Sequence, residues 1–109
     1  MPLTRAFKDT VQTRVQQDPK FRRALLVEAI EALLAGDMAA GKAVLRDYIN
    51  ATIGFETLAE ATHINAKSLM RMLGPSGNPQ AANLFAVLDH LQSVEGIALE
   101  LRVSRRHRS

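Results

Sequence analysis

The sequence predicts an all-α domain with one β-strand near its C-terminus. Three observations favour this class. Apolar residues recur at helical spacing through most of the chain, capping residues with Gly and Pro divide that pattern into segments, and only the last segment alternates with a period of two. A chain of 109 residues, 47% hydrophobic and 23% charged, has the size and composition of a single globular domain.

The first two helices are predicted from apolar spacing and from a capping pair. Residues 4–17 form a helix with a narrow apolar stripe made of Phe7, Val11 and Val15. Asp18 and Pro19 then supply an N-cap and a favoured first residue for a second helix, which we expect to run to about Ala35. The residues of this second helix expected to face the core are Leu26, Ile30, Leu33 and Leu34.

A third helix is predicted between Gly36 and Gly54, with Asp37 as its N-cap. Its apolar residues repeat at four-residue steps, and we expect the ring of Tyr48 to be buried with its hydroxyl hydrogen-bonded. The residues of the second and third helices expected in solvent are Arg22, Arg23, Lys42, Arg46, Asp47 and Asn50. Residues 1–53 thus form an N-terminal helical extension.

Residues 54–95 have the features of a helix-turn-helix, in which two short helices cross through a tight turn and the second enters the major groove of DNA. Ala59 is small enough for close packing of the second helix on the first, and Ile64 anchors the turn. Asn65 is a suitable N-cap for a second helix over residues 66–73. The residues expected to face inward are Leu58, Leu69, Met72 and Leu73.

The run LAEATHINAKSLMRMLGPSGNP, followed by NLFAVLDHL, resembles the helix-turn-helix of lambda-repressor-like (XRE-type) regulators. The whole chain is similar to the probable addiction-module antidote proteins, the HigA-type antitoxins, whose short form also ends in a glycine and an alternating strand. The residues that carry the XRE-type match are Leu58, Ala59, Ile64, Leu69, Gly74, Pro79 and Leu84. The resemblance implies a protein that binds operator DNA, represses its own operon and neutralises a cognate toxin protein.

Some positions depart from the pattern of this family. The family prefers Gly in the turn, where the backbone takes a positive φ, and this chain has His63 there. The family usually caps the first motif helix with Ser or Thr, and this chain offers Gly54. Ala66 and Met70 leave few base-reading groups on the second helix.

The resemblance also implies which residues contact DNA. Arg71 can bind guanine O6 and N7 through two hydrogen bonds, and Lys67, one helical turn earlier, can bind a base edge or a phosphate. The predicted contacts of the second helix are Asn65, Ala66, Lys67, Ser68 and Arg71; the predicted phosphate contacts are Gly54, Phe55, Ser76, Gly77 and Asn78. The alternative is that Lys67 and Arg71 form an ordinary solvated helix face.

Residues 96–104 carry the predicted strand, whose inward residues are Ile97, Leu99, Leu101 and Val103. A lone strand leaves unpaired backbone groups along its edges, so we expect a two-fold pair of these strands in a homodimer or addition to a partner's sheet. The alternative is an extended tail packed on the helices. Residues 105–109 form a basic tail, which either contacts the DNA backbone or only aids solubility.

Composition excludes several classes of function. The chain has no cysteine, which excludes disulfides, thiolate catalysis and Cys-based metal sites. The three histidines lie at no metal-ligand spacing, and neither a nucleophile–base pair nor a phosphate-binding glycine loop is present. We therefore expect no enzyme activity, no cofactor and no metal.

The net charge of +3 is not evidence for nucleic-acid binding, because it comes from the tail. Four of the fourteen Lys and Arg residues lie in the last eight residues, and the rest of the chain has ten cations against eleven carboxylates. The longest apolar stretch is interrupted by glutamates, and the N-terminus has no apolar core typical of a signal peptide. We expect a cytoplasmic protein with no membrane partner.

These observations together predict a sequence-specific DNA-binding transcriptional regulator that acts as a homodimer on double-stranded DNA. An antitoxin role follows from the resemblance alone. The alternative function is a helical protein–protein adaptor whose helix-turn-helix does not touch DNA.

Overall fold

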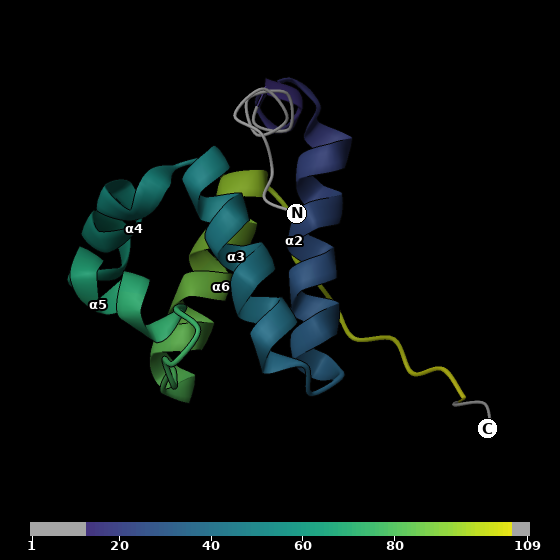
Figure 1. The fold of residues 1–109 in the computed structure, drawn as a ribbon. Coiled ribbons are helices and arrows are strands. Elements are labelled where there is room, and N and C mark those ends of the chain that lie inside the picture. Colours follow the sequence, from purple (N-terminus) through teal and green to yellow (C-terminus); the bar gives the residue numbers. More distant parts are fainter. Residues whose placement is uncertain (1–12, 106–109) are drawn as a thin grey trace, which may run out of the picture.

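The computed structural model describes residues 13–105, in which helices follow one another and no strand is formed (Figure 1). Residues 13–17 are helical, and the helices after them are α2 (Pro19–Leu34), α3 (Met38–Ala51), α4 (Gly54–Thr62), α5 (Ala66–Met72) and α6 (Ala81–Glu95). The all-α class is therefore confirmed for this part of the chain. Phe7 and Val11 of the predicted first stripe lie outside the described residues, whereas Val15 is fully buried.

The predicted N-caps of α2 and α3 are confirmed. Asp18 accepts hydrogen bonds from the N–H groups of Lys20 and Phe21 at 3.0 and 3.2 Å and so caps α2. Asp37 caps α3 by accepting from the N–H of Ala40 at 3.1 Å. Each of these caps satisfies N–H groups that have no partner within the helix.

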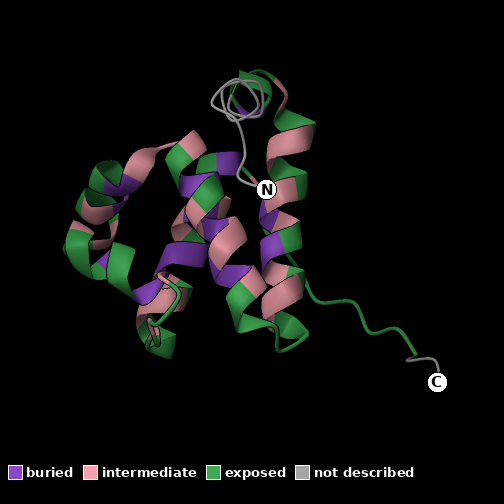
Figure 2. Ribbon diagram, in the orientation of Figure 1, coloured by how far each residue is buried: buried purple, intermediate pink, exposed green. Residues whose placement is uncertain are grey.

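The core lies where α3 meets α2 on one side and α4 and α6 on the other. α2 and α3 lie side by side, and α4 and α5 lie on the side of α3 away from α2 (Figure 1). Buried residues concentrate on the faces that these helices turn toward one another (Figure 2). The largest fully buried side chains are Tyr48, Leu26, Leu45, Ile49, Leu58, Leu69, Leu73, Leu91, Val15 and Val87.

Leu34 was expected in the core and is 64% exposed instead. The reason is the close approach of α2 and α3 at Gly41, where an added Cβ would lie 2.5 Å from the Leu33 side chain. Leu33 therefore occupies the contact, and Leu34, the next residue on the helix, points away from it. Arg22, Lys42 and Arg46, all expected in solvent, make internal contacts instead, which are described below.

The predicted strand is not formed within the single chain. Residues 97–105 have no regular secondary structure, and their last part runs away from the helices (Figure 1). Ile97 packs against the core and the N–H of Leu99 donates to the side chain of Gln92, whereas Leu101 and Val103 are 82% and 98% exposed, so only the first residues of the tail pack on the helices. Of the basic tail, Arg105 is exposed and residues 106–109 lie outside the described range. Among the described helices, none has the length and apolar character that a membrane crossing requires.

Candidate nucleic-acid interface

A three-residue turn at residues 63–65 joins α4 to α5. His63 takes a left-handed conformation there, with φ 58° and ψ 30°, and it is the only non-glycine residue with positive φ among the described residues. The positive φ expected at this position is therefore confirmed. It stops α4 and lets α5 start in a new direction, at the cost of a conformation that L-residues avoid.

Asn65 caps α5, as predicted. Its Oδ1 accepts hydrogen bonds from the N–H groups of Lys67 at 2.9 Å and Ser68 at 3.4 Å. This use of the carbonyl oxygen leaves only the side-chain NH₂ of Asn65 for a ligand. Its predicted contact with DNA is thereby limited to donating a hydrogen bond to a phosphate or a base acceptor.

α5 has the two faces that the sequence predicts. Leu69, Met72 and Leu73 are buried against the core, whereas Lys67, Ser68 and Arg71 are exposed and Ala66 is half-buried. Within residues 13–105, the side chains of Lys67 and Arg71 make no hydrogen bond or ion pair. Two cations, four residues apart, are thus available to a ligand on the outward face.

Two cations of α3 donate hydrogen bonds to the C-terminal end of α5 and to the loop that follows it. Lys42 donates hydrogen bonds from Nζ to the carbonyl oxygens of Gly77 at 2.7 Å and Pro75 at 3.5 Å, and Arg46 donates to the carbonyl of Leu73. The predicted solvent position of Lys42 is wrong, since this residue is buried. Cations are favoured at this end of a helix because its last carbonyls are unpaired.

The loop after α5 forms the floor of a shallow polar hollow. Residues predicted to contact DNA come together here with others that the sequence analysis missed. The lining consists of Ser68, Arg71, Met72, Ser76, Gly77, Asn78, Gln80 and Asn83. Gly77 is required in this loop, because a Cβ would lie 2.0 Å from the carbonyl oxygen of Arg71. A hollow lined by hydroxyls, amides and one guanidinium suits a phosphate group.

A second hollow lies between α4 and the N-terminal end of α5 and is partly acidic. Glu56 and Glu60 line it together with His63, Asn65 and Lys67. Carboxylates disfavour a phosphate on this side of the α4–α5 turn. Arg71 thus lines a hollow that has no carboxylate, whereas Lys67 lines one that has two.

The start of α4 differs from the prediction. The N-cap position is held by Ile53, not Gly54, and no side chain caps the helix. Phe55 has its side chain buried, and Glu56 brings a negative charge to the first turn. Gly54 has no side chain and that of Phe55 is buried, so these two residues can offer a phosphate only their backbone N–H groups. The negative charge of Glu56 competes with a phosphate for the positive end of the helix dipole.

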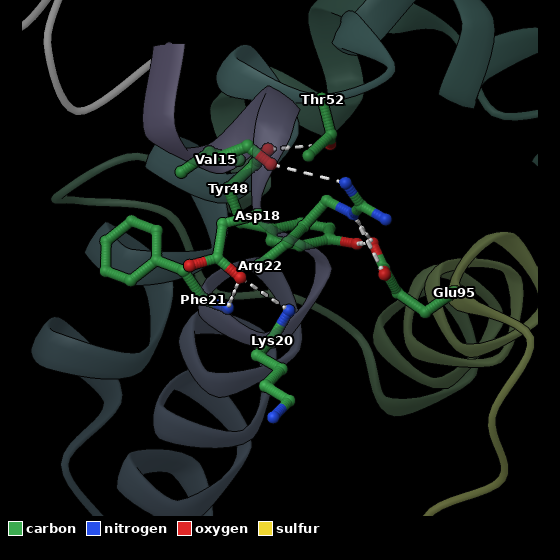
Figure 3. A network of polar contacts seen from close by, with 8 residues as sticks. All are labelled: Val15, Asp18, Lys20, Phe21, Arg22, Tyr48, Thr52 and Glu95. Atoms are coloured by element: carbon green, nitrogen blue, oxygen red, sulfur yellow. Dashed lines mark hydrogen bonds and ion pairs between the residues drawn. The ribbon is translucent and has the colours of Figure 1, made fainter.

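A buried polar network joins α2, α3 and α6 (Figure 3). Arg22 donates from Nε to both carboxylate oxygens of Glu95, at 2.9 and 2.8 Å, and from a terminal nitrogen to the carbonyl of Val15 at 3.2 Å. The Tyr48 hydroxyl donates to the same carboxylate, which confirms the expected burial and pairing of this ring. The side chain of Glu95 has no exposed area and that of Arg22 has 24%.

This network is structural in character. Burial, followed by the hydrogen bond to Glu95 and the charge of that carboxylate, raises the pKa of Tyr48 far above its ordinary value. The hydroxyl is therefore a hydrogen-bond donor and not a base at neutral pH. Periodicity could not reveal the network, since Arg22 and Glu95 lie in distant segments and each fits a solvated position. Among the described residues, no group of three His, Asp or Glu side chains could hold a metal ion.

Comparisons with known proteins add no family assignment: no protein-family model, curated protein or solved structure matches this chain.

Proposed function

We propose that this protein is a DNA-binding transcriptional regulator in which α5 enters the major groove. The observation that carries the proposal is the pair of exposed cations, Lys67 and Arg71, on the outward face of a short helix that a turn sets apart from α4. Arg71 would read guanine, and Lys67 would contact a neighbouring base or phosphate. Ser68 and the polar hollow at residues 76–83 would hold the DNA backbone beside them.

The charge of this region indicates that one copy alone would bind weakly. Residues 54–95 contain two cations, Lys67 and Arg71, against four carboxylates, and one of those carboxylates is neutralised internally by Arg22. Non-specific affinity for DNA scales with the number of phosphates that a protein neutralises. The proposed regulator is therefore a two-fold dimer, joined through residues 97–103, with its two α5 helices about 34 Å apart on an inverted repeat. Repression of its own operon and neutralisation of a toxin are parts of the proposal that rest on the resemblance to HigA-type antitoxins.

Selection of bound duplexes from a random library, followed by a salt series on the preferred site, tests this function. The change Arg71→Ala should flatten the preference at one base pair per half-site, and Lys67→Ala should weaken all sequences more evenly. Arg23→Ala is a matched control, because Arg23 is an exposed cation on α2. Loss of affinity that is equal for all three variants would contradict a specific role for α5.

A second candidate function is a helical adaptor that binds another protein through α5. Exposed Met70 lies between Lys67 and Arg71, and Glu56 and Glu60 line the hollow next to Lys67. An apolar side chain amid mixed charges is typical of a protein-binding surface. If the selection at low salt enriches no duplex, the adaptor is favoured, and Met70→Ala should then weaken partner binding more than Lys67→Ala.

A further inference from the structure

The extended C-terminal segment presents a free strand edge to solvent. The N–H of Ile97 donates to the carbonyl of Gln92 at 3.0 Å, and the N–H of Leu99 donates to Oε1 of the same residue at 2.7 Å. In an extended chain, the backbone N–H and C=O groups of successive residues point to opposite edges, so those of every second residue share one edge. The edge formed by residues 98, 100 and 102 therefore points away from Gln92, and its backbone groups make no hydrogen bond within the described residues.

An open apolar groove lies beside this segment, between α2 and α6. Its apolar walls are Val27, Ile30, Leu34, Phe85 and Leu88, together with Leu99 and Leu101 of the segment itself. The polar residues that also line it are Glu31, Asp89, Gln92 and Glu100. Phe85 is 66% exposed and Leu34 is 64% exposed, so the described residues leave both side chains largely uncovered. Contiguous exposed apolar surface of this kind marks an interaction site.

We propose that a second copy of this chain covers this surface by antiparallel pairing of residues 97–103, with the two-fold axis at Leu101. An antiparallel pair keeps apolar residues opposite apolar residues only if the axis passes through a residue and not between two residues. Within the segment this leaves Leu99, Glu100, Leu101 and Arg102 as the central candidates. An axis at Leu99 places Glu100 opposite the partner's Ala98 and forms no ion pair, and the pattern of charges decides among the other three registers.

An axis at Glu100 would place two carboxylates opposite each other, and an axis at Arg102 would place two guanidiniums opposite each other. An axis at Leu101 places Glu100 opposite the partner's Arg102, and symmetry makes this pair twice. Opposite charges stabilise a cross-strand pair, and like charges destabilise it. Charge complementarity therefore selects Leu101.

The same register agrees with the free edge. Glu100 and the partner's Arg102 become a hydrogen-bonded pair, because their backbone groups lie on the edge that Gln92 leaves open. Leu101 then faces the partner's Leu101 as a non-hydrogen-bonded pair, with the closer Cα separation of about 4.5 Å. The apolar side chains of both strands share one side of this ribbon, on which Leu99 and Leu101 already line the groove.

This inference rests on the two-fold dimer of the proposed function but not on DNA binding, so it is tested without DNA. The chain has no cysteine, and single cysteines can therefore report the register. Leu101→Cys should form a disulfide-linked dimer on mild oxidation, because only directly opposed residues approach within the Cα distance that a disulfide needs. Glu100→Cys and Arg102→Cys should each link poorly alone and should link to one another when mixed.

Efficient self-linking of Glu100→Cys or Arg102→Cys would overturn the register, and absence of any link in all the variants would overturn the pairing. Circular dichroism of each variant checks that the helices are intact. Since these positions are exposed, a loss of fold is not expected.

Charge exchange gives an independent test by sedimentation. Glu100→Arg and Arg102→Glu should each raise the dimer dissociation constant about tenfold, because each change turns two attractive pairs into repulsive ones. An equimolar mixture of the two variants should restore dimerisation, since both cross-strand pairs are then again of opposite sign. Unchanged dimerisation of each single variant would contradict the proposed pairing.

The groove is tested by Phe85→Ser, which should weaken dimerisation. Val94→Ser is its control, since Val94 is an exposed apolar residue on α6 that does not line the groove. Equal effects of the two changes would overturn the docking of the partner in this groove. A dimer that binds no DNA would leave this inference standing and contradict only the proposed function. A monomer that binds DNA would overturn this inference and the dimer of the proposed function, but not DNA binding by α5.

Discussion

Lys42 on α3 donates a hydrogen bond to the carbonyl oxygen of Gly77, 35 positions later in the chain, at a distance of 2.7 Å. This contact ties the N-terminal helices to the loop that follows α5. Arg46, one turn further along α3, donates to the carbonyl of Leu73 at the end of α5. The N-terminal extension is thus part of the support that fixes α5, and not a separate appendage.

Replacing the buried ammonium of Lys42 should destabilise the protein. Lys42→Met keeps most of the apolar stem but leaves the carbonyl of Gly77 without its donor, which should lower the free energy of unfolding by about 1–3 kcal/mol. Urea denaturation measures the change. Lys20→Met is the control, because Lys20 is exposed at the start of α2 and should shift stability by less than about 0.5 kcal/mol. Equal effects of both changes would contradict a specific role for the contact.

Breaking the Arg22–Glu95 pair should lower the free energy of unfolding by more than Lys42→Met does. Arg22→Met leaves a carboxylate with no exposed area unpaired, and such a loss costs about 3–5 kcal/mol in a fully buried pair. Since Arg22 keeps 24% of its side-chain area in contact with solvent, we expect a value near the lower limit, about 3 kcal/mol. Glu95→Gln should cost less, because a neutral amide oxygen can still accept from Tyr48.

Arg23→Met provides the matched control for this prediction, as Arg23 is the exposed neighbour of Arg22 on the same helix. Urea denaturation of the three variants gives the comparison. If Arg22→Met and Arg23→Met lowered the free energy of unfolding equally, the pair would contribute nothing beyond the loss of an arginine.

The raised pKa of Tyr48 predicts a loss of stability in alkali. Burial next to Glu95 keeps the hydroxyl protonated in the folded state, whereas in the unfolded chain it ionises near the ordinary pKa of 10.0. The contribution of the protonated Tyr48 hydroxyl to the free energy of unfolding is therefore complete below pH 10 and declines above it, by up to about 1.4 kcal/mol for each pH unit. The difference in unfolding free energy between the natural chain and Tyr48→Phe, measured from neutral pH upward, should shrink accordingly.

Tyr48 is the only tyrosine of the chain, so tyrosinate absorbance offers a second measurement. The folded protein should resist ionisation at pH values at which the urea-unfolded protein has already titrated. If the difference in unfolding free energy between the natural chain and Tyr48→Phe stayed constant with pH, the raised pKa of Tyr48 would be contradicted.

The parts of the structure that could be predicted from sequence are those set by neighbouring residues. Asp18, Asp37 and Asn65 cap helices because a carboxylate or amide oxygen reaches N–H groups only two or three residues away. The faces of α5 follow equally from local spacing, whereas the positive φ of His63 is expected from the resemblance to XRE-type regulators. For this reason most helix boundaries of the described residues agree with expectation.

The parts that could not be predicted depend on residues far apart in the chain. Lys42 and Arg22 each occupy a position that periodicity assigns to solvent, and only the packed fold brings Gly77 and Glu95 within reach of them. The strand predicted at residues 97–103 is a stronger case, since no strand forms among residues 13–105. The alternation of the sequence shows which residues share a face, but it does not identify the backbone partner that a strand requires.

Replacing His63 with glycine should stabilise the protein. At φ 58° an L-residue is disfavoured by about 1–2 kcal/mol relative to its usual conformations, and glycine is not. Glycine loses more conformational entropy on folding, which offsets about 0.5–1 kcal/mol of that gain. We expect a net increase of about 0.5 kcal/mol in the free energy of unfolding, measured by urea denaturation. His63→Ala keeps the disfavoured backbone and should give no increase, so a stabilisation by both substitutions would instead point to the exposed imidazole as the source of the cost.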